Sequence, residues 1–166
     1  MAQSEPINPT DDEARALAKT LLEDARHGVI GVQDFQTGAP HVARVGVARH
    51  PDGQPMTLVS ELSHHTTALR VEPRCALLVG EPGEKGDPLN HPRMTLACRA
   101  VFIEHGTPDY AILREVYLST YPKAKLYIDF TDFSFAVLLV TSVELNGGFG
   151  KAYRLMPEDL GLDPVP

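Results

Sequence analysis

The sequence has no long apolar run, few cysteines and no excess of positive charge, and each absence excludes a class of protein. Its longest unbroken apolar stretch, residues 135–140, is far shorter than the roughly 20 residues that a membrane helix needs. Cys75 and Cys98 lie in separate apolar runs without C-x-x-C spacing, which indicates two buried thiols in a reducing cytosol. The N-terminus lacks the basic and apolar regions of a signal peptide. We therefore expect a cytoplasmic protein with no membrane partner.

The charge balance argues against a nucleic-acid partner. The formal net charge is −7, from 22 acidic and 15 basic residues, whereas non-specific nucleic-acid binders normally carry the opposite sign. The excess of acid lies in residues 1–24 and 155–166, so the body of the chain is neutral. A length of 166 residues with 43% hydrophobic residues favours one domain with a sizeable core.

The pattern of apolar residues predicts a mainly β (α+β) domain. Thr10 and Glu13 have the spacing of a capping box, and the apolar stripe that follows predicts a helix as far as residues 27–28. Two further helices are predicted over 63–71 and 107–120, and strands over 29–35, 42–48, 56–60, 75–79, 93–104, 133–145 and 149–155. No regular βαβ alternation is present, so these short strands favour a small antiparallel barrel. We expect a disordered segment 1–9, a single domain 10–156 and a loosely held tail 157–166.

No familiar catalytic motif is present, so the catalytic residues stay unknown. The sequence has no G-x-G-x-x-G or P-loop fingerprint, no G-x-S-x-G or H-E-x-x-H motif, and no zinc-ligand spacing, so we expect no metal site.

A phosphate site is the most specific chemistry that the residues suggest. Arg44 and Arg49 flank one predicted strand, and Ser63 is placed to cap a helix that begins with His64 and His65. Positions 44 and 49 would point to opposite faces of a regular strand. Both can serve one site only if a bulge near Gly46 intervenes or if Arg49 lies beyond the strand end.

Several motifs together resemble those of the FMN-binding split-barrel, or pyridoxamine-phosphate-oxidase-like, superfamily. The resemblance covers roughly residues 12–155 and is closest to the haem-utilisation (HugZ-type) branch. The motifs that carry it are Gly38-x-Pro40, Arg44-Val45-Gly46-Val47-Ala48-Arg49, Ser60-x-Leu62-x-x-His65-Thr66, Glu72-Pro73-Arg74, Arg93-Met94-Thr95-Leu96 and Gly147-Gly148-Phe149-Gly150-Lys151-Ala152.

The resemblance implies a six-stranded antiparallel split barrel with flanking helices that forms a homodimer, with FMN in a groove between the subunits. Arg44 and Arg49 match the positions that hold the FMN phosphate, and His64 and His65 replace a basic pair beside it. The other cofactor-binding positions implied in this way are Leu58, Val59, Ser60, Thr66, Arg93, Phe149, Gly150 and Lys151, the last three from the partner subunit.

Two departures from the family pattern leave the function open. The C-terminal arginine and histidine-aspartate-arginine cluster of true pyridoxamine-phosphate oxidases is missing, so oxidation of vitamin B6 is not expected. The C-terminal domain whose histidine ligates iron in the haem-utilisation proteins is also missing, so haem would need another ligand; the candidates are His41, His50, His64, His65, His91 and His105.

Three hypotheses follow from these observations. The first is an FMN-binding oxidoreductase with an unknown small-molecule substrate. The second is a haem-binding or haem-degrading protein on the same barrel. The third is a non-catalytic binding dimer.

Overall fold

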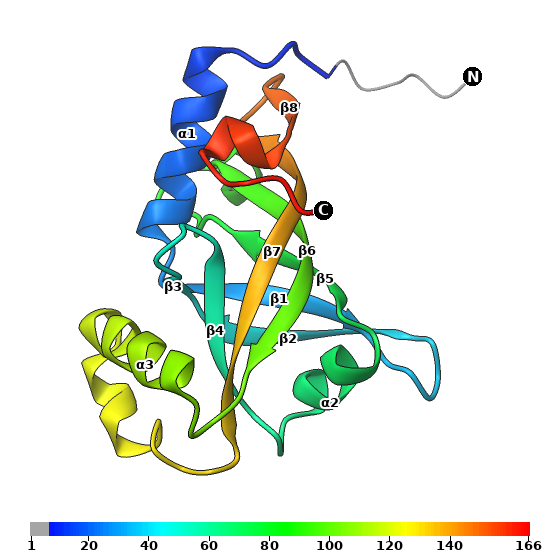
Figure 1. Ribbon diagram of the computed structural model, residues 1–166. Helices are drawn as coiled ribbons and strands as arrows, with labels where there is room; N and C mark the ends of the chain where they lie inside the picture. Colours follow the sequence, from blue (N-terminus) through cyan, green and yellow to red (C-terminus); the bar gives the residue numbers. More distant parts are fainter. Residues whose placement is uncertain (1–6) are drawn as a thin grey trace.

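The computed structural model describes residues 7–166 as an antiparallel sheet with three α-helices (Figure 1). The helices are α1 (Asp12–Asp24), α2 (His64–Val71) and α3 (Pro108–Thr120), with short 3-10 helices η1 (Pro88–Asn90), η2 (Pro122–Leu126) and η3 (Pro157–Leu160). The strands are β1 (His27–Gln33), β2 (Pro40–Gly46), β3 (Ala48–Arg49), β4 (Pro55–Ser60), β5 (Arg74–Val79), β6 (Arg93–Ile103), β7 (Phe133–Asn146) and β8 (Ala152–Leu155). The expected disorder of residues 1–6 lies outside the described residues; within the rest of that segment, Asn8 pairs with Tyr153.

The sheet curls into a half-barrel, which confirms the expected antiparallel fold. Its strand order is β2-β1-β5-β6-β7-β4-β3, and β8 pairs with β7. The expected number of six strands is wrong, because the sheet formed by residues 7–166 has eight. One reason is a break at Val47: β2 ends at Gly46, and Ala48 and Arg49 form a separate short strand that pairs with β4.

The interior of the half-barrel is closed by α1. The helix buries Ala14, Ala18 and Leu22 against the core residues of the strands. The expected cap at Thr10 is wrong: the carboxylate of Asp11 accepts the N–H of Ala14 at 2.8 Å, because the Thr10 hydroxyl donates to the carbonyl of Arg154. The helix therefore starts at Asp12.

The tail 157–166 is more closely packed than expected. Leu160 and Leu162 are buried in the main core, and Asp159 pairs with Arg15 of α1 at 2.8 Å. The burial of these two leucines stabilises the packing of the C-terminal segment beside α1, although the segment contains prolines. Figure 1 shows α1 and the C-terminal segment together at one end of the molecule, and α2 and α3 at the other.

Both cysteines are unpaired, but only one of the two thiols predicted to be buried is fully buried. Cys75 on β5 lies opposite Cys98 on β6, and both are free. Cys98 is buried and Cys75 is partly buried. Burial raises the pKa of the Cys75 thiol to about 12, so it stays protonated near neutral pH.

Candidate functional site

One face of the sheet carries small and apolar side chains that nothing in the described chain covers. We call this surface the outer face and define it by two neighbouring cross-strand rows. The first row is Val42, Gly31, Ala76, Ala97 and Ser142, and the second is Arg44, Val29, Leu78, Thr95, Glu144 and Arg154. Val42 is 66% exposed and Leu78 39%, which is unusual for large apolar side chains on a sheet. The outer face is therefore a candidate binding surface.

A shallow groove continues this surface toward the end of the sheet. A hollow of about 440 Å³ is lined by Arg93, Thr95, Glu144 and Arg154, among others. A second hollow of about 530 Å³ shares Asn146 and Ala152 with it and is lined by the tip of the β7–β8 hairpin. The guanidinium of Arg93 donates to the carbonyl of Leu89 at 2.8 Å, which holds it at the edge of the groove.

The structure places the C-terminal residues of the predicted site beside that groove. Phe149, Gly150 and Lys151 line the second hollow. Phe149 is 95% exposed, so its ring makes little contact with its own chain. Lys151 lies 3.6 Å from Glu13 of α1. Their expected contact with a cofactor bound to a partner subunit stays a prediction.

The two predicted phosphate arginines lie on different strands. Arg44 is on the outer face, whereas Arg49 follows the break at Val47. Of the two arrangements considered from the sequence, the structure therefore has Arg49 beyond the end of the strand that carries Arg44. The Nε atom of Arg49 is buried without a partner in the described chain, and its guanidinium lies near Gly53 and Leu162.

His64 and His65 open α2 as predicted, but they lie against the β1–β2 hairpin. His64 Nε2 is 2.7 Å from a carboxylate oxygen of Asp34, and its ring centroid is 4.6 Å from that of His41. Because His41 alternates with Val42 along β2, this cluster lies on the opposite side of the strand from Arg44. Within one chain the structure thus does not bring the histidines and Arg44 to one point.

The remaining predicted positions near α2 have structural contacts of their own. Ser63 precedes α2, but its side chain makes no capping bond. Val59 and Thr66 are buried, and Leu58 packs against the core beneath α3. The hydroxyl of Ser60 donates to Asp132 at 2.6 Å. Any role of these residues in holding FMN stays a prediction.

We expect His65 to make the protein less stable below neutral pH. Burial, reinforced by His41 and His64, lowers the pKa of His65 below its ordinary value of 6.5. Below that value the unfolded chain binds the proton more readily than the folded chain, so the free energy of unfolding falls as the pH drops toward the folded-state pKa. Urea unfolding of the wild type and of His65→Gln at about pH 7.5 and about pH 5.5 should show a smaller loss in the variant. Equal losses would contradict this assignment.

None of the six candidate haem histidines occupies an outward position of the sheet. Besides the cluster at α2, His50 pairs with Asp52 at 2.7 Å, and His91 binds the loop backbone through both ring nitrogens. The ring of His105 is tilted against that of Tyr110, with 4.8 Å between the centroids. His27, which was not among the candidates, does point outward on β1, with Nε2 2.6 Å from Glu81. Its alternation with Val29 was the signal that could have identified it, but the expected end of the first helix covered this residue.

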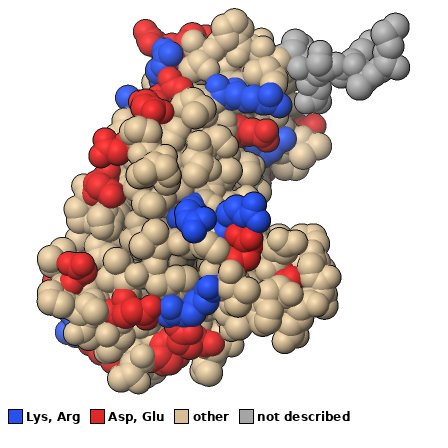
Figure 2. Space-filling model, turned by 45° about the vertical axis from the view of Figure 1, so that its right-hand side comes forward, with Lys and Arg blue, Asp and Glu red and all other residues tan. Residues whose placement is uncertain are grey.

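Two further arginines border the outer face, and Figure 2 shows Lys and Arg side chains near the middle of a largely uncharged surface. Arg74 and Arg99 lie directly opposite each other on β5 and β6.

Within residues 7–166 no group of His, Cys, Asp and Glu has the arrangement of a metal site. No helix among these residues is long and apolar enough to cross a membrane.

The curled antiparallel sheet with its flanking helices defines a protein of the split-barrel class, which confirms the resemblance seen in the sequence. Residues 9–160 match the family described as "CREG, beta-barrel", and the chain belongs to this family.

Two relatives have names that mention haem. The chain is 35% identical over 137 residues to "Non-canonical heme oxygenase HOZ, chloroplastic" of Arabidopsis thaliana, covering 81% of this chain and 40% of the relative. It thus spans less than half the length of that protein. A solved heme binding protein from Mycobacterium smegmatis is 28% identical with a TM-score of 0.78, covering 96% of this chain and 63% of the other.

Flavin-binding proteins share the fold at lower identity. A FAD-binding protein from Mesorhizobium loti (mll6688) is 15% identical with a TM-score of 0.63, covering 81% of this chain and 92% of the other. At this level the likeness concerns the fold alone. The split barrel thus has both haem-binding and flavin-binding neighbours.

Proposed function

We propose that this protein binds haem on the outer face of its sheet. The observation that carries the proposal is the uncovered strip of small and apolar residues, bordered by arginines that lack an anionic partner in the described chain. The strip includes Gly31, Ala76 and Ala97, and Arg44 and Arg99 border it. The names of the Arabidopsis and Mycobacterium relatives support haem as the ligand.

The residues present fit such a ligand. Haem combines a flat apolar macrocycle with two carboxylates, so it needs an apolar surface with cations at its edge. The outer face offers Val29 and Leu78 for contact with the macrocycle. At Ala76 and Ala97 the side chains are short, which leaves room for a flat ligand to lie against the sheet. His27 is the described histidine that shares this face, and Glu81 orients its ring. Bound haem would supply an iron centre for oxygen chemistry.

A second copy of the chain would complete this site. A macrocycle lying on an open sheet keeps one side in water, and Val29, Val42 and Leu78 would stay partly exposed. Packing two outer faces against each other would cover both, and the exposed ring of Phe149 at the hairpin tip would be available for contact with the second subunit. We therefore propose that the working form is a homodimer.

FMN binding by an oxidoreductase of this fold is the second candidate. It is favoured by Arg49, whose buried Nε lacks a partner in the described chain, since such a group suits a phosphate. The split-barrel neighbours that bind flavin agree with it only at the level of the fold.

Absorbance titrations decide between the candidates. We expect purified protein to produce a Soret band with haem that saturates at a fixed stoichiometry and shifts from that of free haem. Titration with FMN under the same conditions should leave the flavin fluorescence unchanged. Quenching by FMN without any haem signal would reverse the choice, and silence with both ligands would leave the non-catalytic dimer.

A further inference from the structure

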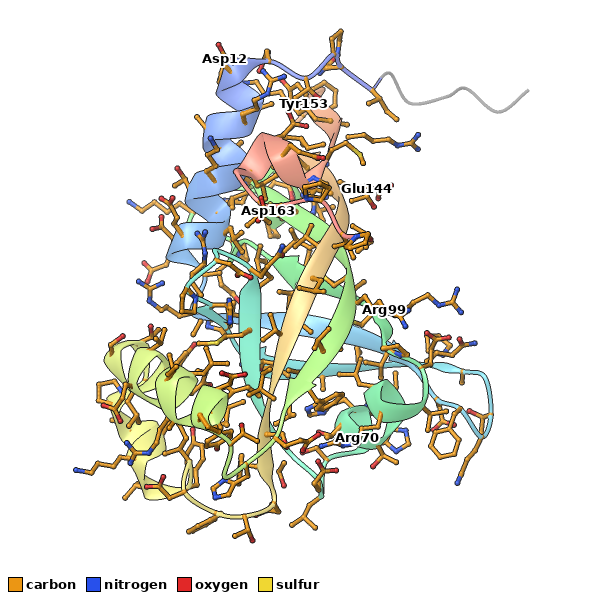
Figure 3. The ribbon with its side chains drawn as sticks, in the orientation of Figure 1. Asp12, Arg70, Arg99, Glu144, Tyr153 and Asp163 are labelled. Atoms are coloured by element: carbon orange, nitrogen blue, oxygen red, sulfur yellow. The ribbon has the colours of Figure 1, made fainter. Side chains whose placement is uncertain are left out.

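Arg74 and Arg99 form a pair of like charges across two neighbouring strands. They are register partners on β5 and β6, and both side chains are exposed. Figure 3 shows Arg99 projecting away from the sheet. Like charges placed directly opposite each other in a sheet destabilise it. An anion bound between them would remove that repulsion.

The surrounding charges only half neutralise this pair. Glu72 binds Arg74 through both carboxylate oxygens, at 2.9 and 2.7 Å. The Arg74 guanidinium, helped by Arg99, lowers the pKa of Glu72 to about 2, so this carboxylate is ionised. Arg99 itself makes no hydrogen bond or ion pair with its side chain within residues 7–166. One positive charge is therefore left over on Arg99.

The free cation borders the apolar strip of the outer face. Ala97 lies two residues before Arg99 on the same side of β6, which is about 6.6 Å along the strand. On the other side Arg99 is flanked by Leu139, its register partner on β7, and by Val101, which is 41% exposed. A cation at the edge of an apolar surface suits an amphiphilic anion better than a free inorganic ion.

We propose that Arg99, assisted by Arg74, binds a propionate carboxylate of the haem. This inference rests on the proposed haem site and deepens it by naming the residues that recognise the acidic edge of the ligand. A macrocycle over Ala76 and Ala97 has its edge within reach of the Arg99 guanidinium, whose donor fork matches a carboxylate. Arg74 contributes through its field, since Glu72 already occupies its donors.

The test compares haem with its dimethyl ester, in which both propionates are uncharged. We expect Arg99→Gln to weaken haem binding about 10- to 100-fold, the loss that a charged hydrogen bond gives. Arg74→Gln should weaken it less. Binding of the dimethyl ester should be the same in wild type and Arg99→Gln. The matched control is Arg26→Gln, an exposed arginine that donates only to backbone carbonyls beside it, and it should bind haem like the wild type.

The other outcomes each overturn a definite statement. Haem binding by Arg99→Gln that equals the wild type would overturn the role of Arg99 and leave the haem site intact. Failure of wild type to bind either haem or its ester would overturn the haem site and this inference together. Weaker binding of FMN, but not of riboflavin, in Arg99→Gln would assign the arginine to a phosphate instead. A loss of dimer mass in ultracentrifugation, with haem affinity unchanged, would assign it to an acidic group of the second copy.

Discussion

Replacing Phe135 by alanine is expected to lower the free energy of unfolding by about 3–5 kcal/mol. Phe135 is fully buried beneath α3, and its ring centroid lies 4.9 Å from that of Tyr110 and 5.6 Å from that of Tyr117. Both tyrosines belong to α3, so the cavity would open between this helix and β7. Without the Phe135 ring the two tyrosines also lose their aromatic partner, which adds to the cost of the cavity.

Urea denaturation of the wild type and of Phe135→Ala measures this difference directly. The control is Leu62→Ala, because this side chain is 90% exposed and its removal should change stability by no more than about 0.5 kcal/mol. A loss below about 1 kcal/mol for Phe135→Ala would mean that α3 can close over the cavity, and the described packing of the helix would then be wrong.

Local patterns predicted the elements of the fold because each pattern lies within one segment of the chain. The alternation along β6 and the helical stripe of α1 are set by neighbours in the sequence. Both elements form, but α1 ends at Asp24 rather than at residues 27–28 as expected, because His27 already begins β1. The errors arose where a distant partner decides the outcome. The Thr10 hydroxyl donates to the carbonyl of Arg154 instead of capping the helix. Leu162 is buried in the core by packing against residues that lie far from it in the sequence.

The outer face could not be read from local patterns, since the residues that form it are joined only by strand register. Arg74 and Arg99 are far apart in sequence, and only the β5–β6 pairing makes them neighbours. Arg44 and His64 show the reverse: they are candidates for one phosphate site in the sequence, but β2 separates them. Of the charged residues on the outer face, the sequence therefore suggested Arg44 as a site residue but not Arg74 or Arg99, which only strand register brings together.

Replacing Ala97 by glutamate is expected to reduce haem affinity by more than about 100-fold, the largest functional effect we predict. Ala97 lies in the middle of the outer face, between Ala76 and Ser142 in register. A longer side chain there would prevent a flat ligand from lying on the strip, and its carboxylate would compete for Arg99. Desolvating that charge under a macrocycle or a second subunit adds a further cost.

The effect should not depend on loss of the fold, because Ala97 faces outward and is not part of the core. Haem titration, ultracentrifugation and thermal unfolding of Ala97→Glu should show lost binding and a monomer with little change in Tm. The matched control is Ala111→Glu, which adds the same group at an exposed position of α3. If Ala97→Glu bound haem as tightly as Ala111→Glu, haem could not lie on the outer face, because a glutamate at the centre of that face would prevent haem from binding there.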